Sequence, residues 1–237
     1  MSRLLQQVLL ILLGYVSGSV CFAYLIGRLG CAMDLRSYGS RKLSASNVYS
    51  YLGFGGMALV GVLDIAKAVL PVWIAMRLGQ GLGTRVLVGL AAMVGHNWSL
   101  FLDWRGGRGL SAALGLLLLT FPLGVLWILA WVAVGRLVPH MAAAPALVGV
   151  ASLPIVALWR DQGSAIVWGC VGILLLTVAK RIEGNRLPMP TGERASRVLM
   201  RRLLLDRDIA DFDAWIAYVP NVDDSPHEAC PMGSGHI

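Results

Sequence analysis

The sequence predicts an all-α integral membrane protein with seven transmembrane helices, and three observations support this fold class. Of 237 residues, 57% are hydrophobic and only 14% are charged, whereas a soluble domain is near half apolar and a quarter charged. Long apolar stretches alternate with short basic loops, which is typical of a polytopic membrane protein. The basic residues flank the apolar stretches, so the net charge of +7 indicates orientation in a membrane rather than a nucleic-acid partner.

The apolar stretches predict the transmembrane helices in order. The first, Leu4 to Arg28, is too long for a cleavable signal peptide. The fourth has 12 residues, which span roughly 18 Å of a hydrocarbon core of roughly 30 Å, so it is a short helix. The other expected helices are Leu52–Arg77, Arg85–Leu102, Leu110–Phe121 (the short fourth), Leu123–Val138, Met141–Trp159 and Gly163–Ala179.

The distribution of charge favours seven crossings over six. With seven, one side of the membrane receives Arg28, Arg36, Arg41, Lys42, Arg105, Arg108, Arg136 and the tail from Lys180 onward, and the other side receives only Arg3, Arg77, Arg85 and Arg160. The positive-inside rule then places the N-terminus outside and the C-terminus in the cytoplasm. We therefore expect a multi-pass protein of the cell inner (cytoplasmic) membrane, with membrane lipid around it.

The composition changes after the membrane domain, which we assign to residues 1–193. Apolar residues at helical spacing from Val198 to Val219 predict an amphipathic cytoplasmic helix within residues 194–219, lying on the membrane or packing on the domain. The small, polar and proline-bearing residues 220–237 predict a disordered tail.

A glycine-rich loop lies where the third predicted helix ends and the short fourth begins. Its sequence is Trp104-Arg105-Gly106-Gly107-Arg108-Gly109. Glycines let backbone N–H groups turn inward, and a helix N-terminus stabilises a phosphate group, to which the two arginines add full charges. The alternative is a tight cytoplasmic turn that carries arginines only because of its side of the membrane.

A second basic loop, from Asp34 to Asn47, is rich in hydroxyl groups and lies on the same predicted face. Together the two loops predict one anion-binding site at the cytosolic surface. The alternative for the second loop is an ordinary solvated loop. Inside the helices, Asp64 and Lys67 share a helix face and form an expected ion pair. His96 and Asn97 precede the glycine loop and either serve the site or bond a neighbouring helix.

These motifs resemble the PlsY-type bacterial glycerol-3-phosphate acyltransferases. The resemblance covers roughly residues 10 to 193 and rests on Ser17-Gly18-Ser19-Val20, Tyr38-Gly39-Ser40, Ala45-Ser46-Asn47-Val48, Leu63-Asp64-Ile65-Ala66-Lys67, Gly95-His96-Asn97 and Arg105-Gly106-Gly107-Arg108-Gly109. It implies a seven-helix membrane enzyme that moves a fatty acyl group from acyl phosphate to position 1 of glycerol 3-phosphate. It implies no metal and no other cofactor. The products would be phosphate and lysophosphatidic acid for phospholipid synthesis.

The chain departs from the family pattern at several positions. Ser50 stands where the family has an arginine, Lys42 where it has an asparagine and Arg108 where it has a lysine. In the third family motif the histidine is missing, Asn185 is shifted by one residue, and Glu193 lacks the usual spacing from its glycine. These departures leave open an enzyme that acylates a different alcohol, or a non-catalytic membrane scaffold.

An acyl phosphate is already activated, so the chemistry requires positioning and charge stabilisation. The proton of the attacking hydroxyl would pass to His96 or to the departing phosphate. The residues assigned to catalysis are His96 and Ser40, and those assigned to substrate binding are Lys42, Ser46, Asn47, Asn97, Gly106, Gly107, Arg108, Gly109, Asn185 and Glu193.

Overall fold

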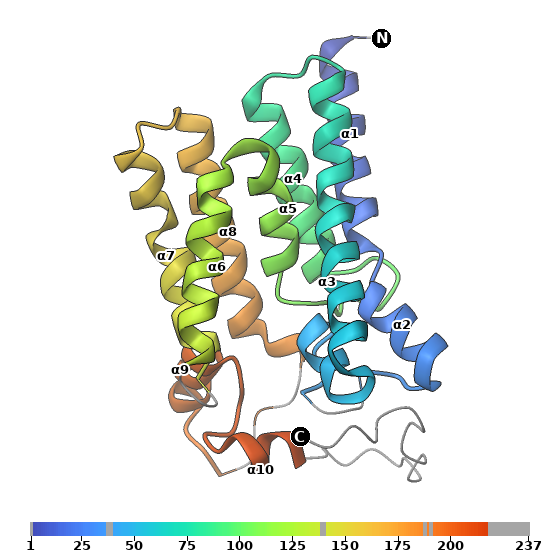
Figure 1. Ribbon diagram of the computed structural model, residues 1–237, viewed down its shortest axis with the longest axis vertical. Helices are drawn as coiled ribbons and strands as arrows, with labels where there is room; N and C mark the ends of the chain where they lie inside the picture. The colour runs from blue at the N-terminus through green and yellow to red at the C-terminus, as the bar shows by residue number, and fades with distance from the viewer. Residues whose placement is uncertain (1, 37–39, 138–140, 187–188, 190–191, 218–237) are drawn as a thin grey trace.

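The fold is a bundle of roughly parallel helices, and within the described residues it contains no strand (Figure 1). The computed structural model describes residues 2–36, 40–137, 141–186, 189 and 192–217. The elements are α1 (Arg3–Ser19), α2 (Phe22–Cys31), α3 (Ala45–Arg77), α4 (Leu82–Asn97), α5 (Leu110–Thr120), α6 (Pro122–Arg136), α7 (Ala143–Trp159), α8 (Ser164–Glu183), the 3-10 turn η1 (Gly184–Arg186), α9 (Ala195–Leu205) and α10 (Phe212–Ala217). The N-terminal end of α1 and the pair α9–α10 lie at opposite ends of the molecule. The predicted all-α class is confirmed.

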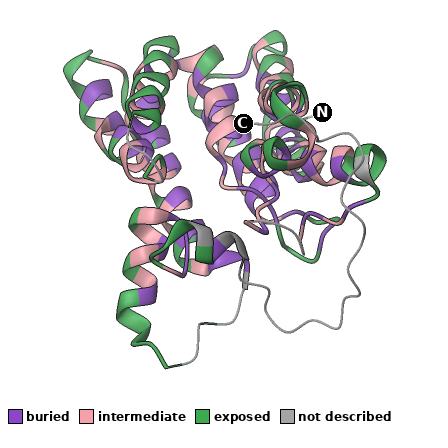
Figure 2. Cartoon of the chain, turned by 60° about the horizontal axis from the view of Figure 1, so that its bottom comes forward, coloured by how far each residue is buried: buried purple, intermediate pink, exposed green. Residues whose placement is uncertain are grey.

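The outer surface of the bundle is suited to lipid. Three helical stretches, Arg3–Gly30, Ala45–Arg77 and Ser164–Glu183, are long and apolar enough to cross a membrane. Large apolar side chains point outward from other helices too, with Leu126 64% exposed and Ile155 67% exposed. Figure 2 shows exposed residues on the outward faces and buried residues where helices meet. So much apolar surface is stable only against hydrocarbon, and the chain is an integral membrane protein.

The first predicted helix is broken, which corrects the expectation of one continuous span. α1 ends at Ser19, and α2 begins at Phe22 at an angle to it (Figure 1). Side chains from segments distant in sequence, one in α3 and one after α4, donate to the carbonyl groups freed at the break. Lys67 donates to the Val20 carbonyl at 2.5 Å, and Ser99 donates to the Ser19 carbonyl at 2.6 Å. Breaks in a membrane helix are tolerated when such partners satisfy the backbone, and this partnership is invisible in local sequence.

Other helix boundaries also differ from the prediction. α3 begins at Ala45 rather than Leu52 and continues through a kink at Gly53. The φ of Gly53, 61°, favours glycine. α4 ends at Asn97 rather than Leu102, so residues 98–109 form an irregular segment between α4 and α5. The short α5 is close to its predicted bounds. As a result the glycine loop lies part-way along the molecule and not at its end (Figure 1).

α1 packs on α4 through glycines. A Cβ atom at Gly14 would lie 2.4 Å from the Val88 carbonyl oxygen, and one at Gly18 would lie 2.0 Å from that of Ala92. The two glycines are four residues apart, and small residues at this spacing let membrane helices approach closely. This contact fixes the end of α4, from which the irregular segment departs.

The expected single amphipathic helix within residues 194–219 is instead two helices. α9 ends at Leu205, its C-cap Asp206 has a φ of 55°, and α10 follows from Phe212. The segment packs on the bundle, since Val198 is fully buried and Arg181 of α8 donates to the Leu203 carbonyl at 2.7 Å. The predicted disordered tail, residues 220–237, lies outside the described residues.

Candidate functional site

A cavity of about 570 Å³ lies at the end of the bundle that carries α9 and α10. One part of its wall is polar and basic, with hydroxyl groups from the loop before α3. The other part is apolar and comes from α3, α5, α6 and α7. Its basic and acidic lining residues are Lys42, Arg108, Arg136, Arg181, Asp206 and Arg207, and its apolar residues include Met57, Leu110, Val132, Ala146 and Val150. Such a wall suits an amphiphile with an anionic head group.

The hydroxyl-rich loop is held by the first turn of α3. The backbone N–H of Ser40 donates to Oδ1 of Asn47 at 3.2 Å, which closes the loop onto the helix. The Ser44 and Ser46 hydroxyl groups lie 3.0 Å apart. Ser50, at the position where the family pattern has an arginine, is also on the cavity wall. The loop therefore offers several short donors to the cavity.

A cluster of ions joins three distant segments at the polar wall. Asp206 lies 2.6 Å from Nζ of Lys42 and 2.8 Å from Nε of Arg108. Burial lowers the pKa of Lys42 below its ordinary value, and Asp206 only partly offsets this. Burial alone would raise the pKa of Asp206, but Arg108, Lys42 and Arg181 outweigh it and hold the pKa below its ordinary value. Asp206 is therefore a carboxylate anion.

The glycine loop is packed against the end of α4. The Gly107 N–H donates to the His96 carbonyl at 3.0 Å, and a Cβ at Gly107 would lie 2.1 Å from His96 Nε2. The Asn185 side chain donates to the Gly106 carbonyl at 3.2 Å. Gly109, whose φ is 78°, is the N-cap of α5. The Gly107 N–H thus has a partner within the protein, and the loop sets the position of Arg108.

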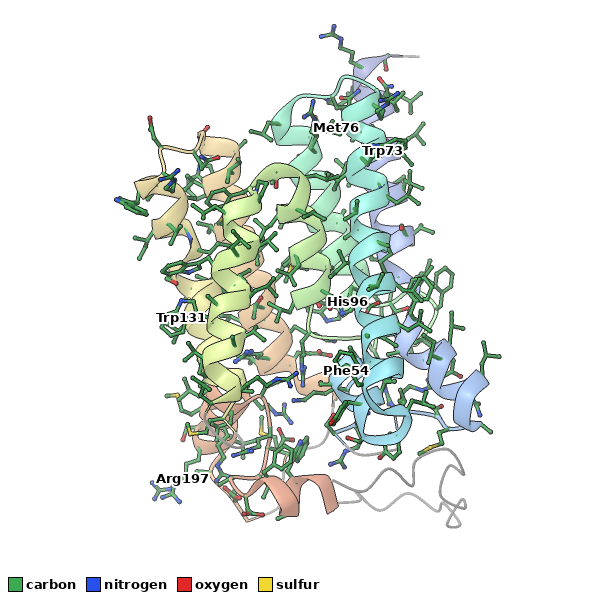
Figure 3. All side chains as sticks on the ribbon, in the orientation of Figure 1. Phe54, Trp73, Met76, His96, Trp131 and Arg197 are labelled. Atoms are coloured by element: carbon green, nitrogen blue, oxygen red, sulfur yellow. The ribbon has the colours of Figure 1, made fainter. Side chains whose placement is uncertain are left out.

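Behind the loop lies a second polar cluster, in the bundle interior near the labelled His96 of Figure 3. Lys67 and Asp64 form the predicted ion pair at 2.8 Å, and His96 Nδ1 lies 3.8 Å from Asp64. Asn97 is fully buried, and neither atom of its amide has a hydrogen-bond partner among the described residues. Its Oδ1 would lie 2.7 Å from a Cβ at Gly109.

The structure brings part of the predicted site together. Five of the predicted residues line the cavity: Ser40, Lys42, Ser46, Asn47 and Arg108. Six others are not on its wall and either form the glycine loop or contact it: Gly106, Gly107, Gly109, His96, Asn97 and Asn185. Glu193 is exposed and pairs with Arg201, away from the cavity.

Sequence reasoning missed several residues of the cavity wall, among them Arg136, Arg181, Asp206, Arg207 and Trp215. Arg136 and Arg181 lie in the last turns of α6 and α8. The sequence indicated them only by placing both on the predicted cytoplasmic side. Nothing in the sequence distinguishes Asp206 from the acidic residues that follow it. Its role depends on the break between α9 and α10.

These features define a helical integral membrane protein with a cationic cavity continued by an apolar wall. Its fold is similar to the crystal structure of PlsY (YgiH), an integral membrane glycerol 3-phosphate acyltransferase, in its glycerol 3-phosphate form, with a TM-score of 0.70 and 24% identity over 84% of this chain and 94% of that chain. The lysophosphatidic acid form of that protein gives a TM-score of 0.69.

The sequence comparisons identify the family. Glycerol-3-phosphate acyltransferase 5 of Dehalococcoides mccartyi is 32% identical over 94% of this chain and 97% of its own length. The glycerol-3-phosphate acyltransferase of a Synechococcus species is 36% identical over 69% of this chain and 82% of its own length. The family model described as glycerol-3-phosphate acyltransferase matches residues 8–187. The chain belongs to this family, as the motifs predicted.

Proposed function

We propose that this membrane enzyme moves a fatty acyl group from an acyl phosphate to glycerol 3-phosphate, giving lysophosphatidic acid for phospholipid synthesis. Family membership supports the reaction, and the observation that carries it is the cavity. Its basic wall offers Lys42, Arg108 and Arg181 to phosphate groups, and its apolar wall between α3, α5, α6 and α7 matches a fatty acyl chain. A substrate with both parts is an acyl phosphate.

We also propose the arrangement in the membrane. The α1–α2 stretch and the six helices α3 to α8 make seven crossings, with the N-terminus outside and α9, α10 and the cavity on the cytoplasmic side of the inner membrane. Arg36, Lys42 and Arg108 then lie on the cytosolic side, as the positive-inside rule requires. Glycerol 3-phosphate, which is soluble, would enter the cavity from that side.

In the proposed reaction, the 1-hydroxyl oxygen of glycerol 3-phosphate attacks the carbonyl carbon of the acyl phosphate. The bond from that carbon to the bridging phosphate oxygen breaks, and phosphate leaves. Arg108 and Arg181 stabilise the charge of the leaving phosphate, which accumulates in the transition state. Lys42, Ser46 and Asn47 hold the acceptor, and Ser40 orients its hydroxyl group.

The cavity wall also bears on the choice of base. His96 does not line the cavity, and its ring lies against Gly107. We therefore assign the hydroxyl proton to the departing phosphate, and assign His96, Asn97 and Asn185 to holding the glycine loop that presents Arg108. Such substrate-assisted transfer needs no side-chain base of matched pKa.

The direct test incubates the purified full chain with palmitoyl phosphate and a panel of alcohols and identifies the products by mass spectrometry. Lysophosphatidic acid formed from glycerol 3-phosphate supports the proposal. If only another alcohol is acylated, glycerol 3-phosphate is not the acceptor. If no alcohol is acylated, the proposed acyltransferase activity is wrong.

A second acceptor has one observation in its favour. Ser50 lines the cavity where the family pattern places an arginine. An acceptor without a phosphate would need one cation fewer there, so the same panel should include uncharged polyols such as glycerol.

A further inference from the structure

The carboxylate of Asp206 enters the site from a segment outside the family match. The family model ends at residue 187, whereas Asp206 lies between α9 and α10 in the left-handed conformation. Two contacts hold this turn in place. Arg202 forms hydrogen bonds with both oxygens of Asp208, at 2.6 and 2.9 Å. Trp215, which is 3% exposed, lies under the guanidinium group of Arg41 at 4.6 Å.

Asp206 is positioned as a phosphate oxygen would be. It is the one acidic side chain among the described residues of the cavity wall, which also carries five basic ones. Its distances of 2.6 and 2.8 Å to Lys42 and Arg108 are those of charge-assisted contacts between a cation and an oxyanion. A phosphate that binds either cation, the donor's at Arg108 or the acceptor's at Lys42, must therefore displace Asp206 from it.

The contact with Arg108 is close but incompletely formed. Neither Nε of Arg108 nor Oδ1 of Asp206 makes a hydrogen bond of good geometry with a described residue, although the two atoms are 2.8 Å apart. A phosphate has more oxygens, in a tetrahedral arrangement, and a second negative charge. A phosphate dianion can thus replace the carboxylate with a gain in contacts.

We propose that Asp206 determines the specificity of this site by occupying the phosphate position until a phosphate dianion displaces it. This rests on the proposed function only in that the ligand carries a phosphate group. A monoanion such as acetate brings no more charge than Asp206 and must compete with a tethered carboxylate of high effective concentration. The site occupied by Asp206 therefore excludes monoanions and admits phosphate compounds. When a phosphate compound binds, α9 and α10 loosen.

The test compares Asp206→Asn with a matched control, Asp161→Asn. Asp161 also has a positive φ, of 49°, where Asp206 has 55°, and asparagine tolerates this conformation. Asp161 is exposed between α7 and α8, at the opposite end of the bundle from α9 and α10. Binding of orthophosphate and of acetate to the full chain in detergent is measured by calorimetry.

If Asp206 is paired with Lys42 and Arg108 in about 90% of the wild-type molecules, Asp206→Asn binds orthophosphate roughly tenfold more tightly than wild type. The same variant binds acetate, whereas wild type and Asp161→Asn do not. Weaker orthophosphate binding in Asp206→Asn would mean that Asp206 positions the cations, and this overturns the proposal. Equal binding in both variants overturns it as well.

Hydrogen exchange of the wild-type chain supplies a second measurement that depends on no variant. Added orthophosphate should speed amide exchange in residues 195–217 while slowing it in the loop 40–47. Unchanged or slower exchange in residues 195–217 overturns displacement, even if Asp206→Asn binds phosphate more tightly. Neither measurement depends on acyl transfer. Both therefore still test the role of Asp206 if the acyltransferase assay fails.

Discussion

Two ion clusters lie on opposite sides of the glycine loop, and they differ in what surrounds them. The Asp64–Lys67 pair is closed within the bundle, with side chains 2% and 4% exposed, and Lys67 also satisfies the carbonyl at the helix break. The Lys42–Arg108–Asp206 cluster lines the cavity and joins three segments remote in sequence. The comparison teaches that an ion pair enclosed by packed helices serves the structure, whereas one that lines a cavity is available to a ligand.

The largest expected effect comes from breaking the closed cluster. Lys67→Met leaves Asp64 without its cation and Val20 without its donor, so we expect a loss of about 3–5 kcal/mol in the free energy of unfolding. Thermal unfolding of the purified protein in detergent measures it. The control is Arg36→Met, because the partly exposed pair with Asp34 contributes at most about 1 kcal/mol. Equal effects from the two variants would refute the difference between closed and exposed pairs.

Gly107→Ala tests the loop between the two clusters. The added methyl group would meet His96 Nε2 at 2.1 Å and the Leu43 carbonyl at 2.8 Å, and such overpacking costs about 1–3 kcal/mol. Because the displaced loop carries Arg108, we expect acyl transfer to fall more than the melting temperature does. Gly83→Ala, where the methyl group meets open space, is the matched control. A fully active Gly107→Ala would show that the loop is only a turn.

Arg108→Ala tests the open cluster directly. It removes a charge-assisted contact of about 1.5–3 kcal/mol, which should appear as a higher KM for acyl phosphate while the protein still folds. Arg160→Ala, at the other end of the bundle, should leave the kinetics unchanged. If Arg108→Ala and Arg160→Ala have the same kinetics, Arg108 does not bind the substrate.

Ser50→Arg and Lys42→Ala together identify the cation that binds the acceptor. If the site lacks the arginine of the family pattern, wild type uses glycerol 3-phosphate poorly and Ser50→Arg improves kcat/KM several-fold. If Lys42 already supplies this charge, wild type is competent and Lys42→Ala is the damaging change. An absence of effect from both, with every acceptor tested, would contradict acyl transfer at this cavity.

The smallest expected effect concerns pH. Burial holds the pKa of Lys42 below its ordinary value of 10.5, so the ammonium loses its proton at a lower pH than an exposed lysine does. Because the charged form binds phosphate, kcat/KM for glycerol 3-phosphate should fall as the pH rises through this lowered pKa. Lys42→Arg keeps its charge at these pH values and should abolish the decline. If kcat/KM still falls with rising pH in Lys42→Arg, the titrating group is not Lys42.

Much of this fold follows from local properties of the sequence, and the site follows only in part. Apolar stretches located α1 and α3 to α8, because lipid requires long apolar segments. The break after Ser19 was missed because its compensation comes from Lys67 and Ser99, far along the chain. Ser40, Lys42 and Arg108 were found as hydroxyl and basic residues in loops. Asp206 was missed because its position depends on how α9 and α10 dock.

The junction between α5 and α6 bears on how the chain is made. Phe121 is at once the C-cap of α5 and the N-cap of α6, and Pro122 opens the second helix. α5 alone has 11 residues and reaches only about 17 Å, roughly half of the hydrocarbon core. α5 and α6 therefore form one apolar hairpin with no polar loop between its arms. We expect the two helices to enter the bilayer together, as one hydrophobic unit.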